Sequence, residues 1–440
     1  MILMIITFVI FFILSSFYIW KKSQIFFLAY SILFAYTIFT QLAYLFYPEE
    51  LNIIFSNQYY GEETFVPYWT YIFLSFISIF LIFILLYEKK YKTIFRLETN
   101  PLLKKTNSFL YITVIFFYEL VLIFFLAKNY ENLSYFNQTI LKDNTIWVYL
   151  FSINGVILLS LFYKIYTTYK KDWKVFYIIL FILSVSVFLI TAIRAGQRIE
   201  IAVAILGFIV FLWFAFRDKI QNKRQILKYG FLILFITILL FQGIRTTRGG
   251  EITIGTFLEK IKKPEIYLNL FLPKTLIFQD WVGPSMTLVT SIEQDIIFPG
   301  RVVESNLKTL IPFISHQSLG EILSRIIDPG GIQSQGYGYY ILTEGYNFMG
   351  FTGFVYAAFI FVLGFRLLES FFTNTKDKLF NAFMYGIIAF LIIDIVRGQS
   401  IGFLKGLYLY FLPALLLFIL MNNKKVYLTG PKMKTEINQK

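Results

Sequence analysis

Two arginines, Arg194 and Arg198, stand four residues apart in the segment TAIRAGQRIEI, which has apolar sequence on both sides. A guanidinium binds a phosphate through two parallel N–H···O bonds, whereas a lysine ammonium acts as a point charge. Residues four apart share one face where a helix continues. Gly196 between them leaves room for backbone and ligand to approach closely. The pair therefore has the chemistry of a phosphate-binding site.

Three further arginines lie at the ends of apolar segments. Arg245 and Arg248 lie in GIRTTRGG, and Arg397 lies in IIDIVRGQS. Elsewhere the chain prefers lysine, with 29 lysines against 11 arginines, and Lys405 is the exception near these ends. Arginines can simply anchor helix ends by extending to lipid headgroups. Five at one membrane level favour an anion site instead, most simply one for a lipid-linked pyrophosphate.

The elements that would position these arginines are membrane helices. Of 440 residues, 58% are hydrophobic and 15% are charged, against roughly 25% charged residues in a soluble domain. Apolar runs of about 20 residues, enough to cross a bilayer, recur along the chain. The sequence predicts an all-α polytopic membrane protein with eleven transmembrane helices, at 2–19, 24–46, 67–87, 108–127, 147–167, 175–194, 199–216, 229–244, 347–368, 380–397 and 404–421.

The distribution of positive charge predicts the orientation. Of the 40 lysines and arginines, 25 lie on the side that holds the C-terminus, so the positive-inside rule places the N-terminus outside and the C-terminus in the cytoplasm. An odd number of spans agrees with this orientation. We expect four parts: spans 1–8 within 1–244, an extracytoplasmic loop at 245–346, spans 9–11 within 347–421, and a basic cytoplasmic tail at 422–440.

The loop at 245–346 is too long for a simple connection, and loops of this length usually carry function. Its segments IYLNLFLPKTLIF (266–278) and LKTLIPFI (307–314) are apolar enough to lie on a bilayer. We expect short interfacial helices that partly cover the helix bundle.

Several classes of site are excluded by composition. The chain has no cysteine and one histidine, His316, which rules out disulfides, thiolate nucleophiles and cysteine-bearing zinc sites. No nucleotide-binding glycine motif is present, and the carboxylates of IEQD (292–295) favour a solvated loop over a metal site. We therefore expect no metal and no cofactor. We also expect no nucleic-acid partner, since the excess positive charge is explained by membrane orientation.

The RAGQR turn, the outer RTTR, the long outer loop and the segment GYGYYILTEGYNFMGFTG (336–353) together resemble the Wzy-type polymerases of O-antigen and capsule repeat units. This family is related in architecture to the O-antigen ligases. The resemblance covers nearly the whole chain in topology, but its motifs are loose. It implies a bacterial cytoplasmic (inner) membrane enzyme of lipopolysaccharide or other polysaccharide biosynthesis, with its active site facing the periplasm or exterior.

The resemblance also implies the reaction. Such glycosyltransferases move a glycan chain from undecaprenyl pyrophosphate to the non-reducing end of an incoming lipid-linked unit, so both donor and acceptor are undecaprenyl-pyrophosphate-linked oligosaccharides. Arginines would stabilise the pyrophosphate leaving group without a metal, as preorganised electrostatics. A chain-length regulator and a flippase are the protein partners that this assignment implies.

Two residues are candidates for the base that deprotonates the acceptor hydroxyl. Glu344 precedes GYNFMGFTG, a pattern similar to the glutamate-then-glycine start of a span in the family. His316 lies in the outer loop, where the related ligases carry a histidine. Their alternatives are a helix-start carboxylate and a surface histidine. Glu251 and Asp280 are weaker candidates.

Aromatic side chains near the loop's return to the membrane could stack on sugar rings, with an interfacial aromatic belt as the equal alternative. These are Tyr337, Tyr339, Tyr340, Tyr346 and Trp281. Within the spans, Asp394 lies one turn before Arg397 and could orient it by a salt bridge. Glu119 favours a helix–helix contact over a proton path.

Two other functions stay open. An O-antigen ligase performs the same chemistry on another acceptor, the lipid A core, and a gene neighbourhood with sugar transferases and a flippase would favour the polymerase. A transporter, such as the flippase itself, would show repeated halves, broken helices and polar residues near the membrane midplane. Here the predicted spans contain few polar residues, and the arginines cluster at their outer ends. This pattern favours the enzyme over the transporter.

The orientation can be tested with a reporter that is active only outside the cytoplasm. Fusions after Gln138 or Ile314 should be active, and fusions after Lys104 or Lys223 should be inactive, because the lysine-rich connections stay in the cytoplasm. The opposite result at any two of these positions would reverse the orientation and remove the argument from the arginines.

Overall fold

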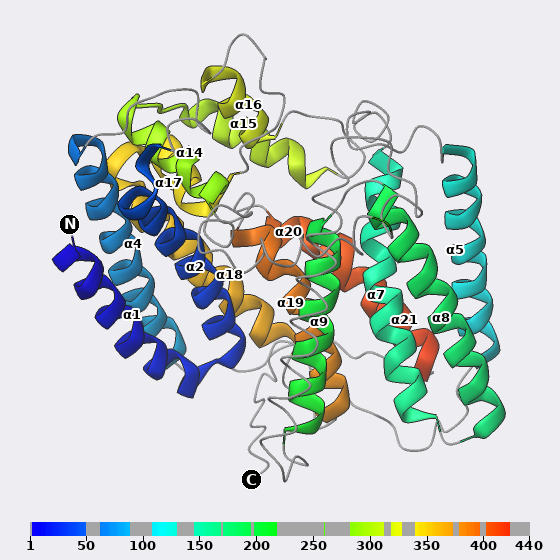
Figure 1. Cartoon of the computed structure of the whole chain (residues 1–440). Coiled ribbons are helices and arrows are strands. Elements are labelled where there is room, and N and C mark those ends of the chain that lie inside the picture. Colours follow the sequence, from blue (N-terminus) through cyan, green and yellow to red (C-terminus); the bar gives the residue numbers. More distant parts are fainter. Residues whose placement is uncertain are drawn as a thin grey trace, which may run out of the picture.

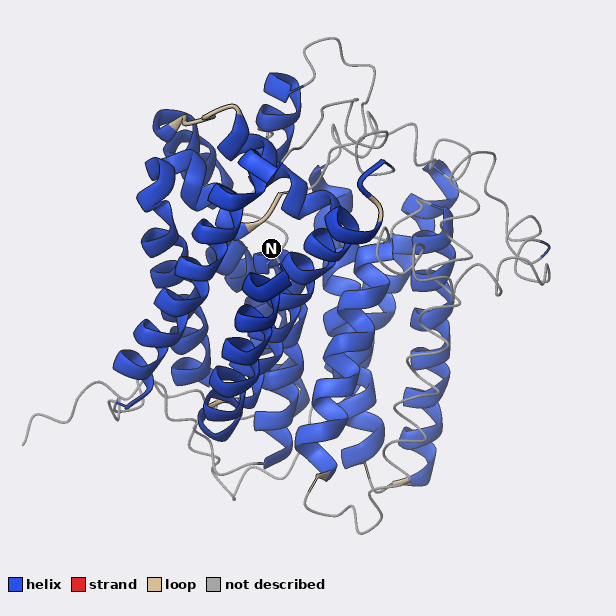
Figure 2. Ribbon diagram, turned by 60° about the vertical axis from the view of Figure 1, so that its left-hand side comes forward, coloured by secondary structure: helices blue, strands red, loops and turns tan. Residues whose placement is uncertain are grey.

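The computed structural model describes residues 2–49, 62–88, 108–129, 145–168, 170–194, 198–217, 259, 282–311, 318–327, 339–372, 378–396 and 402–422. Within these ranges the chain is helical and contains no strand (Figure 2). The predicted all-α class is therefore confirmed for the part of the chain that the structure describes.

Eight segments in the described ranges are long and apolar enough to cross a membrane. The long helices are α1 (Ile2–Lys22), α2 (Gln24–Phe46), α4 (Glu62–Glu88), α5 (Ser108–Asn129), α7 (Thr145–Thr167), α8 (Lys171–Arg194), α9 (Arg198–Phe216), α18 (Gly353–Phe372) and α19 (Lys378–Val396). The last span is formed by α20 (Gly402–Gly406), a π-helical turn η2 (Leu407–Phe411) and α21 (Leu412–Asn422). Helices α7 and α9 are not among the eight, because their described apolar stretches are shorter. The protein is a multi-pass membrane protein.

Four shorter helices lie across one end of this bundle (Figure 1). They are α14 (Val282–Glu293), α15 (Pro299–Leu310), α16 (Leu319–Ile327) and α17 (Ile341–Met349), and a 3-10 turn η1 (Gly350–Thr352) joins α17 to α18. We call these four helices the cap, and the end of the bundle that they cover the cap end.

The long helices form three neighbouring groups (Figure 1). The group α1, α2, α4 and α18 lies on one side, α9 with α19 in the middle, and α5, α7, α8 and α21 on the other side. The cap rests mainly on the first group, because α14 packs against α2, α4 and α17.

Apolar side chains cover the outside of the bundle, as a bilayer requires. Leu3 on α1 is 76% exposed and Phe109 on α5 is 75% exposed. Polar groups within the spans face inward instead, where hydrogen-bond partners replace water. Ser184 of α8 donates to Glu119 of α5 at 2.5 Å, and both side chains are buried. This contact agrees with the predicted helix–helix role of Glu119.

At the end of the bundle opposite the cap, polar side chains tie helix ends together. Ser23 caps the start of α2 and donates to Oε1 of Glu369 on α18. Lys164 of α7 donates to the Met421 carbonyl at the end of α21, at 2.8 Å. Backbone carbonyls at a helix C-terminus lack intrahelical partners, so the lysine satisfies one of them and links two spans.

The middle pair, α9 and α19, packs through small residues. A Cβ on Gly207 would lie 1.9 Å from a ring carbon of Phe390, and a Cβ on Gly386 would lie 3.0 Å from the Gly207 carbonyl. Close backbone approach at glycines is a common way for membrane helices to associate. The Phe390 ring fills the space that the glycines leave.

The structure differs from the predicted spans at one place, and another predicted span is not tested. The predicted span at 347–368 begins earlier, with α17 at Ile341, and is broken at Gly350, whose φ is +61°. A residue with positive φ interrupts helical geometry, and glycine adopts it without steric cost. The predicted span at 229–244 lies outside the described residues.

Gly207→Ala tests the packing of α9 on α19. Alanine normally favours a helix over glycine by about 1 kcal/mol, but here the added methyl meets Phe390, and overpacking costs about 1–3 kcal/mol. The melting temperature of detergent-purified protein should therefore fall. Gly300→Ala on α15 is the matched control, because a Cβ there meets nothing within 4 Å. Equal melting temperatures for both variants would contradict the packing.

Candidate functional site

The end of α8 and the start of α9 lie at the cap end. Helix α8 ends at Arg194 and α9 begins at Arg198, and both helix ends are on the side of the cap in Figure 1. The backbone thus places the two arginines at successive helix ends, as the RAGQR pattern predicts. Their side chains lie outside the part of the chain that the structure describes.

Glu344 lies in the first turn of α17 and is fully buried. Its Oε1 accepts a hydrogen bond from Nδ2 of Asn306, at 2.9 Å, and one from the hydroxyl of Tyr356, at 3.3 Å. Asn306 belongs to α15 and Tyr356 to α18. The carboxylate is therefore held where three helices meet, at the cap end of the bundle.

Glycines allow α17 to reach this position. A Cβ on Gly345 would lie 2.4 Å from the Gly353 carbonyl, and a Cβ on Gly353 would lie 1.8 Å from the Gly345 carbonyl. The positive φ of Gly350 turns the chain back between them. The GYNFMGFTG pattern therefore encodes a fold-back of α17 against the start of α18, and this fold-back points Glu344 toward Tyr356.

Asn347, one turn beyond Glu344, connects α17 to the rest of the cap. Its Nδ2 donates to the Ile296 carbonyl at 2.7 Å and to Oγ of Ser291 at 3.1 Å, and its Oδ1 accepts from the hydroxyl of Tyr339 at 3.0 Å. Burial raises the pKa of the Tyr339 hydroxyl well above its usual value. The phenol stays protonated and keeps donating to Asn347.

Helix α15 crosses the cap end from α17 to η2. At its start, the Phe298 amide donates to the Asn347 carbonyl at 2.8 Å, and at its end the Tyr408 hydroxyl donates to the Thr309 carbonyl at 2.9 Å. Asn306 and Thr309 are three residues apart, which is a rise of about 4.5 Å. The Glu344 carboxylate and the α20–η2 segment therefore lie about one helical turn apart along α15.

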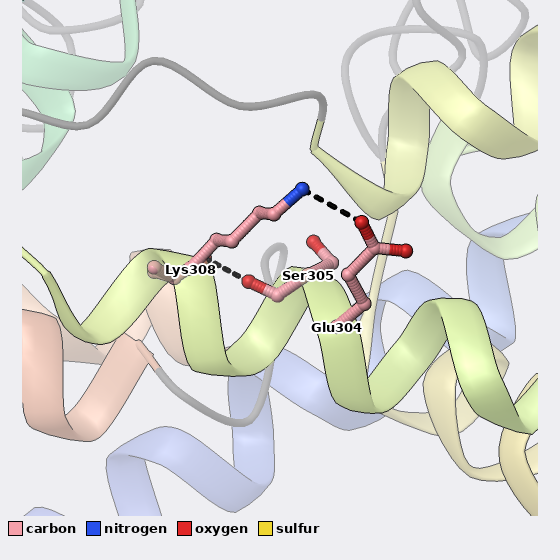
Figure 3. Close-up of polar contacts among 4 residues, drawn as sticks. Glu304, Ser305 and Lys308 are labelled. Carbon is pink, nitrogen blue, oxygen red and sulfur yellow. Dashed lines mark hydrogen bonds and ion pairs between the residues drawn. The ribbon is translucent and has the colours of Figure 1, made fainter.

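The two faces of α15 differ in chemistry. Its inner face carries Val302, Ser305, Asn306 and Thr309, at the three- and four-residue spacing of one helical face. Its outer face carries an ion pair between Lys308 and Glu304, at 2.6 Å (Figure 3), and Lys308 lowers the pKa of this exposed carboxyl. The outer pair is solvated, so only the inner face takes part in the site.

A second polar group lies near the end of α19. Asp394 accepts a hydrogen bond from the hydroxyl of Tyr410, at 3.0 Å, and the charge of Lys405 acts on its carboxylate. Arg397, which sequence reasoning paired with Asp394, lies just past the end of α19 and outside the described residues. The described hydrogen-bond partner of Asp394 is thus Tyr410.

Three of the tyrosines that we expected to stack on sugars are inside the protein. The exposed fractions of Tyr339, Tyr340 and Tyr346 are 4%, 0% and 5%. Tyr339 donates to Asn347, and the Tyr346 hydroxyl donates to Asp295 at 3.0 Å. In this arrangement their rings pack within the cap and offer no open face to a sugar, because most residues of α14 and α17 are buried.

The remaining predicted site residues lie outside the described residues, and for them the predictions stand as they were made. They are His316, Arg245, Arg248, Arg397, Tyr337 and Trp281, together with the weaker candidates Glu251 and Asp280. Among the described residues, no group of three or more His, Cys, Asp or Glu side chains could hold a metal ion.

Sequence reasoning missed Asn306 and Tyr356. For Asn306 no local signal was available, because its helical face is mostly polar, whereas the apolar Val303 and Leu307 lie on the exposed face. For Tyr356 no local pattern points to Glu344, since the contact depends on the fold-back at Gly350.

Comparison with known proteins finds no family model, no curated protein and no solved structure that matches this chain. The function is therefore inferred from the residues themselves and from where the described helices place them.

Proposed function

We propose that this chain is a glycosyltransferase that polymerises undecaprenyl-pyrophosphate-linked oligosaccharide repeat units at the outer face of a bacterial cytoplasmic membrane. The observation that carries the proposal is the buried Glu344 carboxylate, held by Asn306 and Tyr356 at the cap end of a multi-pass bundle. The helix ends at Arg194 and Arg198 lie at the same end of the bundle.

In the proposed reaction, the acceptor hydroxyl oxygen bonds to the anomeric carbon of the donor's reducing-end sugar. The bond from that carbon to the pyrophosphate oxygen breaks, and its electron pair leaves with undecaprenyl pyrophosphate. Glu344 takes the hydroxyl proton as general base, and the arginines Arg194, Arg198, Arg245, Arg248 and Arg397 stabilise the charge that develops on the leaving group.

The reaction needs its base and its arginines at the same depth in the membrane. The sugar–pyrophosphate bond of a polyprenyl-linked substrate lies at the membrane surface, because the polyprenyl chain occupies the bilayer while the glycan stays in water. A base and a set of guanidinium groups at one end of a helix bundle can therefore meet the two sides of the same bond.

Deletion of the gene in the native strain tests this function. Surface glycan should collapse from long polymer to a single repeat unit, because synthesis, flipping and attachment of the unit remain intact. Alanine at Arg194, Arg198, Arg245 or Arg248 should fail to restore polymer, since loss of one stabilising group costs about 3 kcal/mol, roughly 100-fold in rate. Lysine should restore little, because a point charge does not replace two-point phosphate binding.

The other outcomes assign other functions. Absence of attached glycan with accumulation of lipid-linked polymer would indicate a ligase, and single units stranded on the cytoplasmic leaflet would indicate a flippase. Normal polymer from all four alanine variants, with each protein present in the membrane, would return the arginines to helix anchoring.

Glu344→Gln tests the base. Glutamine still accepts a hydrogen bond from Asn306 but cannot take a proton at neutral pH, so turnover should fall by about 100-fold or more while lipid-linked donor still binds. The measurement is chain extension by purified protein, with donor binding measured separately. His316→Ala is the parallel variant. Loss of turnover there, with Glu344→Gln active, would move the base to the histidine, and full activity in both would mean that neither side chain is the base.

A further inference from the structure

Asn306 is the point at which α15 contacts the Glu344 carboxylate. It lies on the inner face of α15, and its Nδ2 donates to Oε1 of Glu344 at 2.9 Å. The side chain is half-buried, which places it at the edge of the cap, whereas Glu344 is fully buried beneath it.

The orientation of this amide is fixed by its partner. An ionised carboxylate only accepts hydrogen bonds, so the amide must turn its NH₂ group toward Glu344 and its oxygen away. Any side-chain flip would set Oδ1 against the carboxylate oxygen at hydrogen-bond distance, where two acceptors repel each other. Glu344 therefore determines where the Asn306 carbonyl points.

The Asn306 carbonyl oxygen is covered and has no hydrogen-bond partner among the described residues. A covered acceptor without a partner costs free energy, and most such groups in folded proteins are paired. Near it, the side chains of Asn347 and Thr309 are hydrogen-bonded. The open acceptor on Asn306 thus lies beside the proposed base.

We propose that Asn306 is the specificity-determining residue for the acceptor sugar, with Oδ1 accepting a hydrogen bond from the group next to the reacting hydroxyl. This inference rests on the proposed function. Glu344 and Asn306, joined by their hydrogen bond, each offer an acceptor to a ligand, which fits two neighbouring donors on a sugar ring. The acceptor class is therefore a sugar whose reacting hydroxyl is flanked by a second hydroxyl or an acetamido N–H.

Each of the two hydrogen-bond donors on the acceptor sugar has its own partner in the site. The reacting hydroxyl gives its proton to Glu344 as its oxygen bonds to the donor's anomeric carbon, and the pyrophosphate leaves from that carbon. The neighbouring donor keeps its proton and holds the ring in place through Asn306. A sugar that lacks the neighbouring donor would leave Oδ1 unpaired and would bind more weakly, since sites with polar groups reject ligands that cannot pair them.

The test measures chain extension by purified full-length protein. A labelled lipid-linked oligomer at fixed concentration serves as donor, and unlabelled single units, extracted from the deletion strain on their native lipid, serve as the varied acceptor. Asn306→Ala should raise the KM for single units by about 3- to 10-fold, the range for one lost hydrogen bond. Binding of the labelled oligomer should be unchanged, because the donor does not contact Asn306.

Asn306→Asp keeps the size of the side chain and carries the test if the alanine variant fails to fold. It sets a second carboxylate against Glu344, and like charges disfavour ionisation. The acid limb of the pH–rate profile should therefore move upward by about one unit or more, with the Tyr339 hydroxyl neutral across that range because burial raises its pKa. Glu304→Ala, on the outer and solvated face of α15, is the control; its KM and pH profile should equal those of wild type.

A KM within twofold of wild type in Asn306→Ala, in protein that folds, would overturn the assignment, as would an unshifted pH profile in Asn306→Asp. Failure of the wild-type protein to extend any chain would overturn the proposed function itself, and is distinguished from these results because it affects every variant alike.

Discussion

Burying a carboxylate at the edge of an apolar bundle is the constraint on which the cap depends. A buried polar group is tolerated only where hydrogen-bond partners replace water, and Glu344 takes these partners from two other helices, Asn306 on α15 and Tyr356 on α18. Neither partner is near Glu344 unless α17 folds back on α18. The contact between Gly345 and Gly353 is therefore a requirement of the carboxylate as much as of the packing.

The same constraint fixes α15. Its start is bonded to α17 through Asn347, its middle to Glu344 through Asn306, and its end to η2 through Thr309. A helix held at three points connects α17 to the last span. Any motion of α15 that uncovers Glu344 must also disturb η2, and a π-helical turn is a common feature next to functional positions.

The fold was largely predictable from the sequence, because bilayer-length apolar runs leave helices as the only way to satisfy the backbone. The spans at 24–46 and 199–216, for example, match α2 and α9 closely. The break at Gly350 and the burial of Tyr340 were not predictable, since both depend on how α17 packs against α14 and α18. That packing is set by contacts between residues far apart in the chain, such as the Tyr71 hydroxyl donating to the Leu342 carbonyl at 3.0 Å.

For the candidate site, residue chemistry pointed to Arg194 and Arg198, and the family resemblance pointed to Glu344. Neither could find the partners of the carboxylate, because hydrogen bonds between elements leave no mark on local sequence. Asn306 is 38 residues from Glu344 along the chain. Nothing in the sequence says which residue the helical face of Asn306 contacts.

The cover over Glu344 has a chemical consequence for the proposed transfer. A base that activates a sugar hydroxyl would equally activate water, and water attack on the donor would release glycan instead of lengthening it. Excluding water from the reacting groups prevents such side reactions. With α15 above it, Glu344 meets only a ligand that can pass the cap and replace its lost solvent with hydrogen bonds of its own. A sugar that pairs with both Glu344 and Asn306 meets that condition, whereas a single water molecule leaves part of the site unpaired.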